Sequence, residues 1–496
     1  MDAYCTDGVT SEIRGINGYE DGQILASWAS PEGRQNIDIG KQIFCNSAVN
    51  MKNIVAIGFD MDYTLAQYKP ETFESLAYDG TVKKLVSDLG YPKELLEWSF
   101  DWTYMVRGLV LDKKRGNILK MDRHKYVKVA YHGFRLISKN EKVATYGNTF
   151  IRDAFDGPDY AHIDTLFSLA EAYLFAQLVD FKDSNPGKIS EEKDYSCMYK
   201  DVRSAVDLCH RDGTLKKMVA KDPRKYINED NLIAPMLKML KTSGRAVFLV
   251  TNSAKPSFFH DENRANLFAV ETESGKLVNT DNGTPLAQVG DPDIELPHQI
   301  PNMRCKVFQG GNVGHLHKLL HVGASSQVLY VGDHIYGDIL RSKKVLGWRT
   351  MLVVPELEKE VKVLSSSRDT RKKLQLLRSE RDQIEDQTHH LKWSLEHENL
   401  DAGEKEKISV KLDLLESQRA RVRAAHQESQ RIFHQKFHPV WGQLMKTGYQ
   451  NSRFADQVER FACLYTSQVG NLGLHSPAKY YRPSEDFMPH DSDILS

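Results

Sequence analysis

The sequence predicts an α/β fold: a doubly wound, Rossmann-like parallel sheet with an inserted cap domain and a long helical hairpin appended. One observation is a series of short apolar runs that end in polar residues, which is typical of strands buried on both faces of a parallel sheet. Segments of helical periodicity separate these runs, and strand, helix, strand is the doubly wound pattern. A second observation is a regular spacing of apolar residues over 366–437, which predicts the hairpin.

Composition indicates an ordinary globular protein. The chain has 496 residues, a hydrophobic fraction of 41% and a net charge of −1, which suits about two to four domains. The six cysteines form no CxxC pair, which favours free thiols in a reducing compartment. No apolar run reaches the length of a membrane span, and the first 30 residues carry several acidic side chains and no hydrophobic signal core. We therefore expect a cytoplasmic protein with neither a membrane nor a nucleic-acid partner.

The first buried strand carries the strongest chemical signal. Residues 54–65 read IVAIGFDMDYTL, so an apolar run ends at Asp60, and Asp62 and Thr64 follow. Two unpaired carboxylates at the end of a buried strand are costly unless something uses them. They would face the crevice at the carboxyl edge of the sheet, where such folds hold ligands. The alternative is a strand followed by an acidic turn, which we would favour for a bare DxD.

Two further strands end in groups that suit the same crevice. Residues 245–250 (RAVFLV) lead into Thr251 and Asn252, and residues 327–331 (QVLYV) lead into Asp333, with Asp338 after a short loop. Residues 348–354 predict a fourth strand. Taken alone, the Thr-Asn pair is commonly a turn or helix cap and Gly-Asp is commonly a turn. Three such strand ends in one order are harder to explain as turns.

The remaining regions divide the chain. We predict a loose segment over 1–45, an α/β core over 46–70 and 233–360, a cap over 71–232, an antiparallel coiled-coil hairpin over 366–437, and a helix and tail packing on the core over 438–496. Helices are expected at 81–89, 162–181, 196–210, 309–320 and 454–469, and short cap strands at 107–112, 117–121 and 126–130. The hairpin is a candidate surface for a homo-oligomer.

The motifs resemble a known family. FDMDYTL resembles the DxDxT motif of the haloacid dehalogenase (HAD) superfamily, which contains many phosphatases. The strings GFDMDYTLAQYKP, KDVRSAVDLCHRDGTLKK, VTNS, YVGDHIYGDILRSKKVLGWRTMLVVPEL and FADQVERFACLYTSQVGNL resemble the cytosolic purine 5′-nucleotidase family. The resemblance implies a HAD-type core and Mg²⁺-dependent hydrolysis of nucleoside 5′-monophosphates, of the purine (IMP or GMP) type, through an aspartyl-phosphate.

The same resemblance implies residue roles. Asp60 would be the nucleophile and Asp62 the general acid and base, while Thr251 and Asn252 would bind phosphate oxygens. Mg²⁺ would be held by Asp60, the backbone carbonyl of Asp62 and Asp333, with Asp338 acting through water or by ordering Asp333. The residues implied for the nucleotide are Arg203, Asp207, Lys216 and His210. From spacing alone, Arg203 and Asp207 share a helix face and would be an ordinary surface ion pair.

One departure from the family pattern concerns the string KPSFF. It begins at Lys255, two residues after Ser253, whereas a helix and a strand separate these motifs in the family. A segment of several tens of residues is therefore absent, and Lys255 is a doubtful phosphate ligand. This leaves two rival functions open: hydrolysis or transfer of another small phosphomonoester, and a catalytically weak protein that binds partners through its hairpin.

Overall fold

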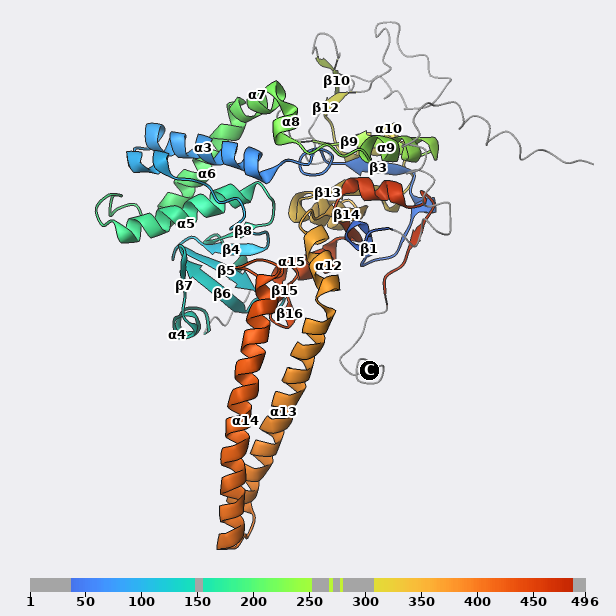
Figure 1. Ribbon diagram of the computed structural model, residues 1–496. Coiled ribbons are helices and arrows are strands. Elements are labelled where there is room, and N and C mark those ends of the chain that lie inside the picture. The colour runs from blue at the N-terminus through green and yellow to red at the C-terminus, as the bar shows by residue number, and fades with distance from the viewer. Residues whose placement is uncertain (1–36, 148–154, 252–266, 271–276, 280–306, 485–496) are drawn as a thin grey trace, which may run out of the picture.

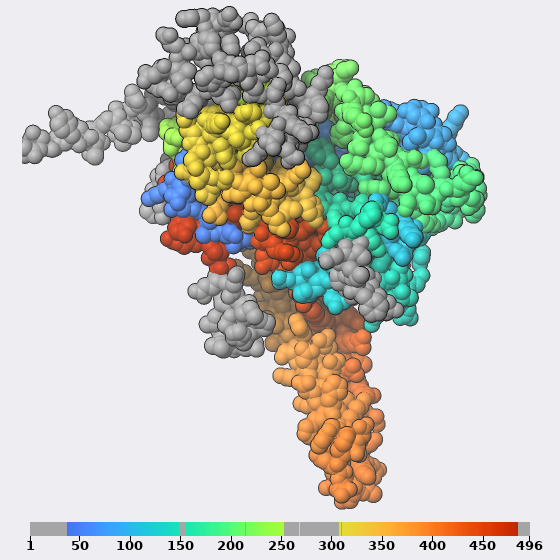
Figure 2. Space-filling model, turned by 180° about the vertical axis from the view of Figure 1, so that it is seen from behind, coloured from blue at the N-terminus to red at the C-terminus, as the bar shows by residue number. Residues whose placement is uncertain are grey.

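The computed structural model describes residues 37–147, 155–251, 267–270, 277–279 and 307–484, and the account below concerns these. The body of the protein has two parts, called layers below, each built around one β-sheet. A long rod of two helices projects away from both layers, as two opposite views show (Figures 1 and 2). No helix in these ranges is both long enough and apolar enough to cross a bilayer. The cysteines at 45, 197, 209 and 463 are free thiols, as predicted for these positions.

A six-stranded sheet forms the centre of the first layer. Its order is β1 (Phe44–Cys45), β17 (Leu464–Thr466), β14 (Arg349–Val353), β13 (Val328–Gly332), β3 (Ala56–Phe59) and β9 (Ala246–Leu249). Every neighbouring pair is parallel except β1 with β17. All four predicted strands are present in this sheet, although β9 is only partly buried and not buried on both faces as predicted. A mixed α/β fold with a parallel sheet is therefore confirmed.

Register aligns the carboxyl ends of the strands that carry the predicted site. Phe59, the last residue of β3, pairs with Val331 of β13 on one side and Leu249 of β9 on the other. Asp60, Asp333 and Thr251 consequently leave the sheet at the same edge. Helices cover both faces: α9 (Ile233–Thr242) packs on the side of Ile57 and Phe59, and α10 (Val313–Leu319) on the side of Tyr330.

Strand β9 ends the sheet in the described part of the chain. Its residues are partly exposed and Leu249 is 46% exposed, whereas β3 and β13 are buried along their whole length. This is the strand directly before the position at which the resemblance implies an absent helix and strand. A sheet edge left open there is what the absence of an outer strand predicts.

The predicted helix over 454–469 is wrong in its second half. Helix α15 (Arg453–Phe461) ends early, and the chain then forms β17 and the 3₁₀ turn η9 (Val469–Leu474). The short apolar run at 462–464 is completely buried beside β14, and periodicity cannot distinguish a buried strand from a buried helix over so few residues. Two segments predicted as loose or extended also pair: β1 joins β17, and β2 (Val49–Asn50) joins β18 (Tyr480–Tyr481).

The second layer comes from the chain between β3 and β9. Its antiparallel sheet has the order β7 (Arg135–Leu136), β6 (Val127–His132), β5 (Asn117–Met121), β4 (Leu109–Asp112) and β8 (Tyr160–Ile163). Helices α3 (Pro70–Asp88), α5 (Ser168–Ser184) and α6 (Tyr195–Arg211) pack with it around one apolar core. The predicted helix over 162–181 begins too early, because β8 pairs with β4 before α5 starts. The predicted strand at 117–121 is confirmed as β5 with the same bounds, and those at 107–112 and 126–130 are confirmed as β4 and β6 with shifted ends.

The rod consists of α13 (Arg368–His397) and α14 (Ala402–Gln435), which run antiparallel as predicted. Ile384, Leu415 and Val422 form its narrow apolar seam. Along the sequence the rod follows α12 (Leu357–Ser366), so it is inserted between β14 and β17, two strands that are neighbours in the sheet.

The remaining α-helices and strands are α4 (Lys139–Lys142), α7 (Thr214–Lys221), α8 (Pro223–Tyr226), α11 (Arg341–Lys344), β10 (Leu267–Val270), β11 (Leu277–Asn279), β12 (Phe308–Gly310), β15 (Lys446–Thr447) and β16 (Gln450–Asn451).

Candidate active site

The loop after β3 turns sharply at the sheet edge. The Asp60 backbone N–H donates to the carbonyl of Val331 at 2.9 Å, which continues the β3–β13 ladder up to the first carboxylate. Tyr63 then adopts a left-handed backbone conformation with φ of 53°, which is uncommon for a residue other than glycine. The chain therefore changes direction directly after the two acids.

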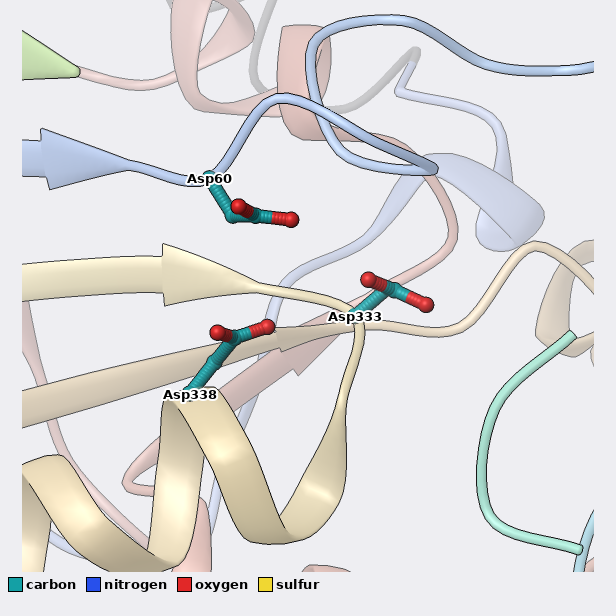
Figure 3. A group of neighbouring side chains, drawn as sticks. All are labelled: Asp60, Asp333 and Asp338. Carbon is teal, nitrogen blue, oxygen red and sulfur yellow. The ribbon is translucent and has the colours of Figure 1, made fainter. Parts of the chain in front are cut away.

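Three carboxylates converge where β3 and β13 end. Oxygen atoms of Asp60, Asp333 and Asp338 all lie within 4.8 Å of one another, and Figure 3 shows the three side chains facing a common space. Asp338 comes from a single π-helical segment, η8 (Ile335–Leu340), and its Oδ2 accepts a hydrogen bond from the His334 N–H at 3.0 Å. The predicted group of acids thus meets, although Asp62 does not contribute its side chain to it.

Burial and mutual repulsion weaken the acidity of all three groups. Burial, and then the charges of Asp338 and Asp62, raise the pKa of Asp60 from 3.8 to about 8, against backbone N–H donors that lower it. Burial also raises the pKa of Asp333 and of Asp338 to about 8. The positive charge of Arg107 partly offsets the rise in the pKa of Asp333, whereas the charge of Asp333 further raises the pKa of Asp338. A cation among them would offset this repulsion.

The donor set suits a hard divalent cation. Three carboxylates supply oxygen ligands of the type that Mg²⁺ prefers. Oδ2 of Asp333 is buried and has no hydrogen-bond partner among the described residues, which is the condition expected of an oxygen that binds a metal ion. Asp333 is 3% exposed, so it could not satisfy this oxygen through bulk water. The residues present therefore fit Mg²⁺.

Two neighbours that the sequence analysis missed shape this group. A Cβ on Gly332 would lie 2.3 Å from Oδ2 of Asp338, so only glycine lets that carboxylate approach β13. Arg107 is 1% exposed and donates to the backbone carbonyl of Asp333 at 3.1 Å, while Glu356 holds its guanidinium through two hydrogen bonds of 2.8 and 2.6 Å. An arginine at the start of a predicted apolar strand was the only sequence signal for this contact.

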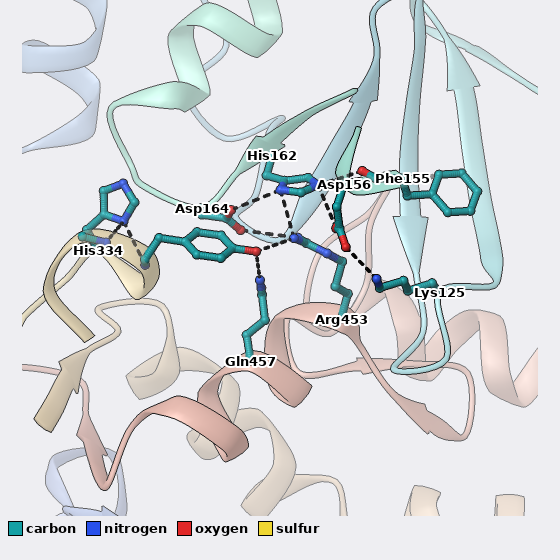
Figure 4. Close-up of polar contacts among 10 residues, drawn as sticks. Lys125, Phe155, Asp156, His162, Asp164, His334, Arg453 and Gln457 are labelled. Carbon is teal, nitrogen blue, oxygen red and sulfur yellow. Dashed lines mark hydrogen bonds and ion pairs between the residues drawn. The ribbon is translucent and has the colours of Figure 1, made fainter. Parts of the chain in front are cut away.

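A second polar network joins η8 to the other layer (Figure 4). The hydroxyl of Tyr336, two residues before Asp338, accepts hydrogen bonds from Arg453 at 2.8 Å and Gln457 at 2.5 Å. Arg453 is buried and its Nη1 lies 3.5 Å from Asp164, which follows β8. The segment that carries Asp338 is thereby attached both to α15 and to the antiparallel layer.

The nucleotide-binding residues implied by resemblance lie together on α6 and α7. Arg203 donates to the buried Glu171 at 2.8 Å and pairs with Asp207 at 3.2 Å, so the predicted shared face is confirmed. The His210 ring packs edge-on against Phe167 with centroids 5.8 Å apart. Burial, and then the charge of Arg203, lower the pKa of His210, with Lys216 adding to this effect and Asp207 and Asp62 opposing it.

That electrostatic link matters because Asp62 belongs to the loop after β3 and His210 to the other layer. Ring contacts support the same placement: Phe167, which packs against His210, also meets Tyr63 of that loop edge-on with centroids 4.8 Å apart, so this end of α6 lies beside the carboxylate loop. Thr251 lies two residues beyond the end of β9 and next to the strand of Asp60, since the intervening Val250 N–H donates to the Phe59 carbonyl at 2.9 Å. Asn252 and Lys255 lie outside the described residues.

Comparison with known proteins identifies the family. The model of the 5′ nucleotidase family matches residues 43–254 and 253–493, two segments that meet just before the string KPSFF, which begins at Lys255. The chain is 27% identical to a 5′-nucleotidase domain-containing protein of Dictyostelium discoideum, over 91% of this chain and 75% of that protein. It is 26% identical to 5′-nucleotidase domain-containing protein 2 of Rattus norvegicus, over 91% of this chain and 80% of that protein. This chain belongs to the 5′ nucleotidase family.

Proposed function

We propose that the protein is a Mg²⁺-dependent phosphomonoester hydrolase of the HAD type that cleaves purine nucleoside 5′-monophosphates. Family membership supports hydrolysis of a nucleoside monophosphate at a coarse level. The single observation that carries the finer proposal is the meeting of Asp60, Asp333 and Asp338 at the carboxyl edge of the sheet. A nucleophilic carboxylate beside a cation site is what phosphoryl transfer requires.

The proposed reaction uses the two acids of the loop after β3. An Asp60 oxygen attacks phosphorus while Asp62 gives its proton to the 5′ oxygen, so the P–O bond breaks and the nucleoside leaves. Asp62, now a carboxylate, takes a proton from water as the water attacks the aspartyl-phosphate. The P–O bond to Asp60 then breaks, which releases phosphate and restores both acids. Bound Mg²⁺, held by Asp60, Asp333, Asp338 and the Asp62 carbonyl, would neutralise phosphoryl charge.

The α6 face would bind the nucleoside. Arg203 and Asp207 offer a charged hydrogen-bonding pair held by a buried carboxylate, and His210 offers an aromatic surface close to the reacting loop. Lys216 is an exposed residue near the start of α7, and its charge adds to the lowering of the pKa of His210. The purine preference rests on the sequence resemblance, and a substrate panel decides it.

The missing helix and strand would lower turnover. The family match breaks at 253–254, and β9 ends the sheet among the described residues. We propose that Thr251 keeps its place at the end of β9 while Lys255, two residues beyond the break, is displaced from the phosphate. Phosphate binding would then depend more heavily on the cation.

The test is a phosphate-release screen over the common nucleotides, with and without Mg²⁺. We expect Asp60→Asn to abolish Mg²⁺-dependent release without changing the circular dichroism spectrum. Asp386→Asn, the same change at an exposed hairpin position, is the matched control and should retain full activity. Equal activity of the Asp60 variant and the control would contradict the proposed nucleophile.

The screen also decides between the rivals. Release from other small phosphomonoesters but not from nucleotides would favour a different substrate for the same site. The hairpin is the feature that favours the second rival, because it extends far from the site and exposes large apolar side chains such as Trp393 and Leu414. Absence of any phosphatase activity, with partner binding lost on hairpin removal, would support an interaction protein.

A further inference from the structure

The side chain of Asp62 has a phenol as its hydrogen-bond donor. The hydroxyl of Tyr68 donates to Asp62 Oδ1 at 2.7 Å, the length of a strong hydrogen bond to a carboxylate. A carboxyl group has two oxygens, and a hydroxyl that donates to one of them favours the other as the site of the transferable proton. The contact therefore helps to fix the orientation of the Asp62 carboxyl group.

Tyr68 is itself held from both sides. Its ring stacks on Phe73 with centroids 4.1 Å apart and meets Tyr63 edge-on at 5.2 Å. Tyr63 occupies the left-handed turn between Asp62 and Thr64, so the same aromatic group packs against the reacting loop. The phenol is thus placed by ring packing before any substrate binds, which is the arrangement expected of a preorganised contact.

The backbone of Tyr68 lies where the chain passes between the two layers. Residues 67–69 lead from the loop into α3, and residues 226–228 return from α8 towards α9. The two segments pair antiparallel: Lys69 N–H donates to the Tyr226 carbonyl and Asn228 N–H to the Gln67 carbonyl, each at 2.7 Å, with Tyr68 opposite Ile227. The donor to Asp62 therefore sits on the connection between the sheet and the layer that would bind the nucleoside.

We propose that Tyr68 is a positioning residue for Asp62, and that its hydroxyl directs the Asp62 proton onto the leaving oxygen. This inference rests on the proposed function. It assigns Tyr68 no bond to the substrate and no proton transfer of its own. Its consequence is selective: the contact matters for a leaving group that needs protonation, such as the alkoxide of a nucleotide, and little for one that leaves readily as an anion.

The experiment compares kcat/KM for a nucleoside 5′-monophosphate and for p-nitrophenyl phosphate in wild type, Tyr68→Phe and Tyr91→Phe. Tyr68→Phe keeps the ring and removes the hydroxyl. Tyr91→Phe is the matched control, because it removes a tyrosine hydroxyl that donates to Asp201 at 2.8 Å, just beyond the end of α3. kcat/KM reports the step that expels the leaving group, so the later hydrolysis of the aspartyl-phosphate does not mask the effect.

For Tyr68→Phe we expect a loss of roughly tenfold with the nucleotide, part of what a general acid usually contributes. The loss with p-nitrophenyl phosphate should be about twofold or less, since a phenolate leaves with little assistance. Tyr91→Phe should match wild type with both. A reduced folded fraction would lower both values in one sample equally, so it cannot imitate a selective loss.

Equal losses with the two substrates, or no loss with the nucleotide, would overturn the assignment of Tyr68 while leaving the proposed function intact. A wild-type protein that hydrolyses neither substrate would overturn both.

Discussion

Replacing Asp338 by asparagine should stabilise the metal-free protein while weakening its response to Mg²⁺. The change removes one of three converging charges and nearly preserves shape. The amide of the new side chain retains a carbonyl oxygen for the His334 N–H, which now bonds to Asp338 Oδ2 at 3.0 Å. The missing Cβ of Gly332 still leaves room for the side chain. The variant therefore tests charge with little change in packing.

The expected magnitude comes from linkage. A carboxyl whose pKa rises from 3.8 in the unfolded chain to about 8 in the folded protein binds its proton more tightly when folded. Its contribution to stability is therefore complete below pH 4 and is lost as the pH rises towards 8, by up to about 1.4 kcal/mol per pH unit. Asp338 shares this repulsion with Asp60 and Asp333, so we expect Asp338→Asn to recover about 2 kcal/mol at pH 8.

The assay is urea denaturation from pH 5 to 8.5, first with a chelator and then with Mg²⁺. Wild type should lose stability with rising pH in chelator and regain it with Mg²⁺, by about 3 kcal/mol at a hundredfold excess over Kd. The variant should show a shallower pH slope and a smaller gain. Asp386→Asn should follow wild type. Identical pH slopes for wild type and Asp338→Asn would refute the reasoning, because they would show that the carboxylates do not repel one another.

Three further predictions concern the rest of the chain. Replacing residues 380–424 with a short Gly/Ser linker keeps the contact between Arg378 and the Tyr449 ring, and should preserve the melting temperature of the two sheet-containing layers and the phosphatase activity. Light scattering would report any loss of an oligomer. Unfolding of the two layers would show that the rod helices are integral to the fold. Restoring a family helix and strand between Ser253 and Lys255 should raise both kcat and melting temperature, so equal values for the two proteins would show that the segment is dispensable. Lys120→Met should lower the free energy of unfolding by about 2–4 kcal/mol, because the buried Lys120 ammonium donates hydrogen bonds to the carbonyls of Trp441 and Gln443. Urea denaturation measures this, and an unchanged midpoint would show that water takes the place of the ammonium.

The parts of the fold with strong local signals were predictable. Apolar runs identified the four strands around the site, and regular spacing identified the hairpin. The carboxylates followed because Asp60 and Asp333 directly end two of those runs, and parallel neighbours bring their ends together. Local sequence carries this information because β3, β13 and β14 are buried along all or nearly all of their length.

The contacts that depend on distant pairing were not predictable. Strand β17 is three residues long, and only its partner β14 distinguishes it from the end of α15. Strand β8 was taken for the start of a helix for the same reason, since its identity comes from β4. Arg107 and Tyr68 act on Asp333 and Asp62 through side-chain contacts that no spacing rule reveals, and hydrogen-bond geometry alone identified them.

The position of β17 has a consequence for how a newly made chain folds. Strand β17 lies between β14 and β1, and among the described residues β1 has no other neighbour in the sheet, so that side of the sheet stays open until residue 466 has been synthesised. About 110 residues separate the paired Val353 and Thr466, a long loop to close. Helices α13 and α14 form from local contacts, which are made early. Once paired, the two helices bring Lys436 within 3.3 Å of Ser367, so that only the residues outside the rod still form a flexible loop. The entropic cost of closing the loop falls by roughly 1 kcal/mol. The rod therefore brings the last central strand to the sheet, and a long unstructured replacement would fold more slowly than either the rod or a short linker.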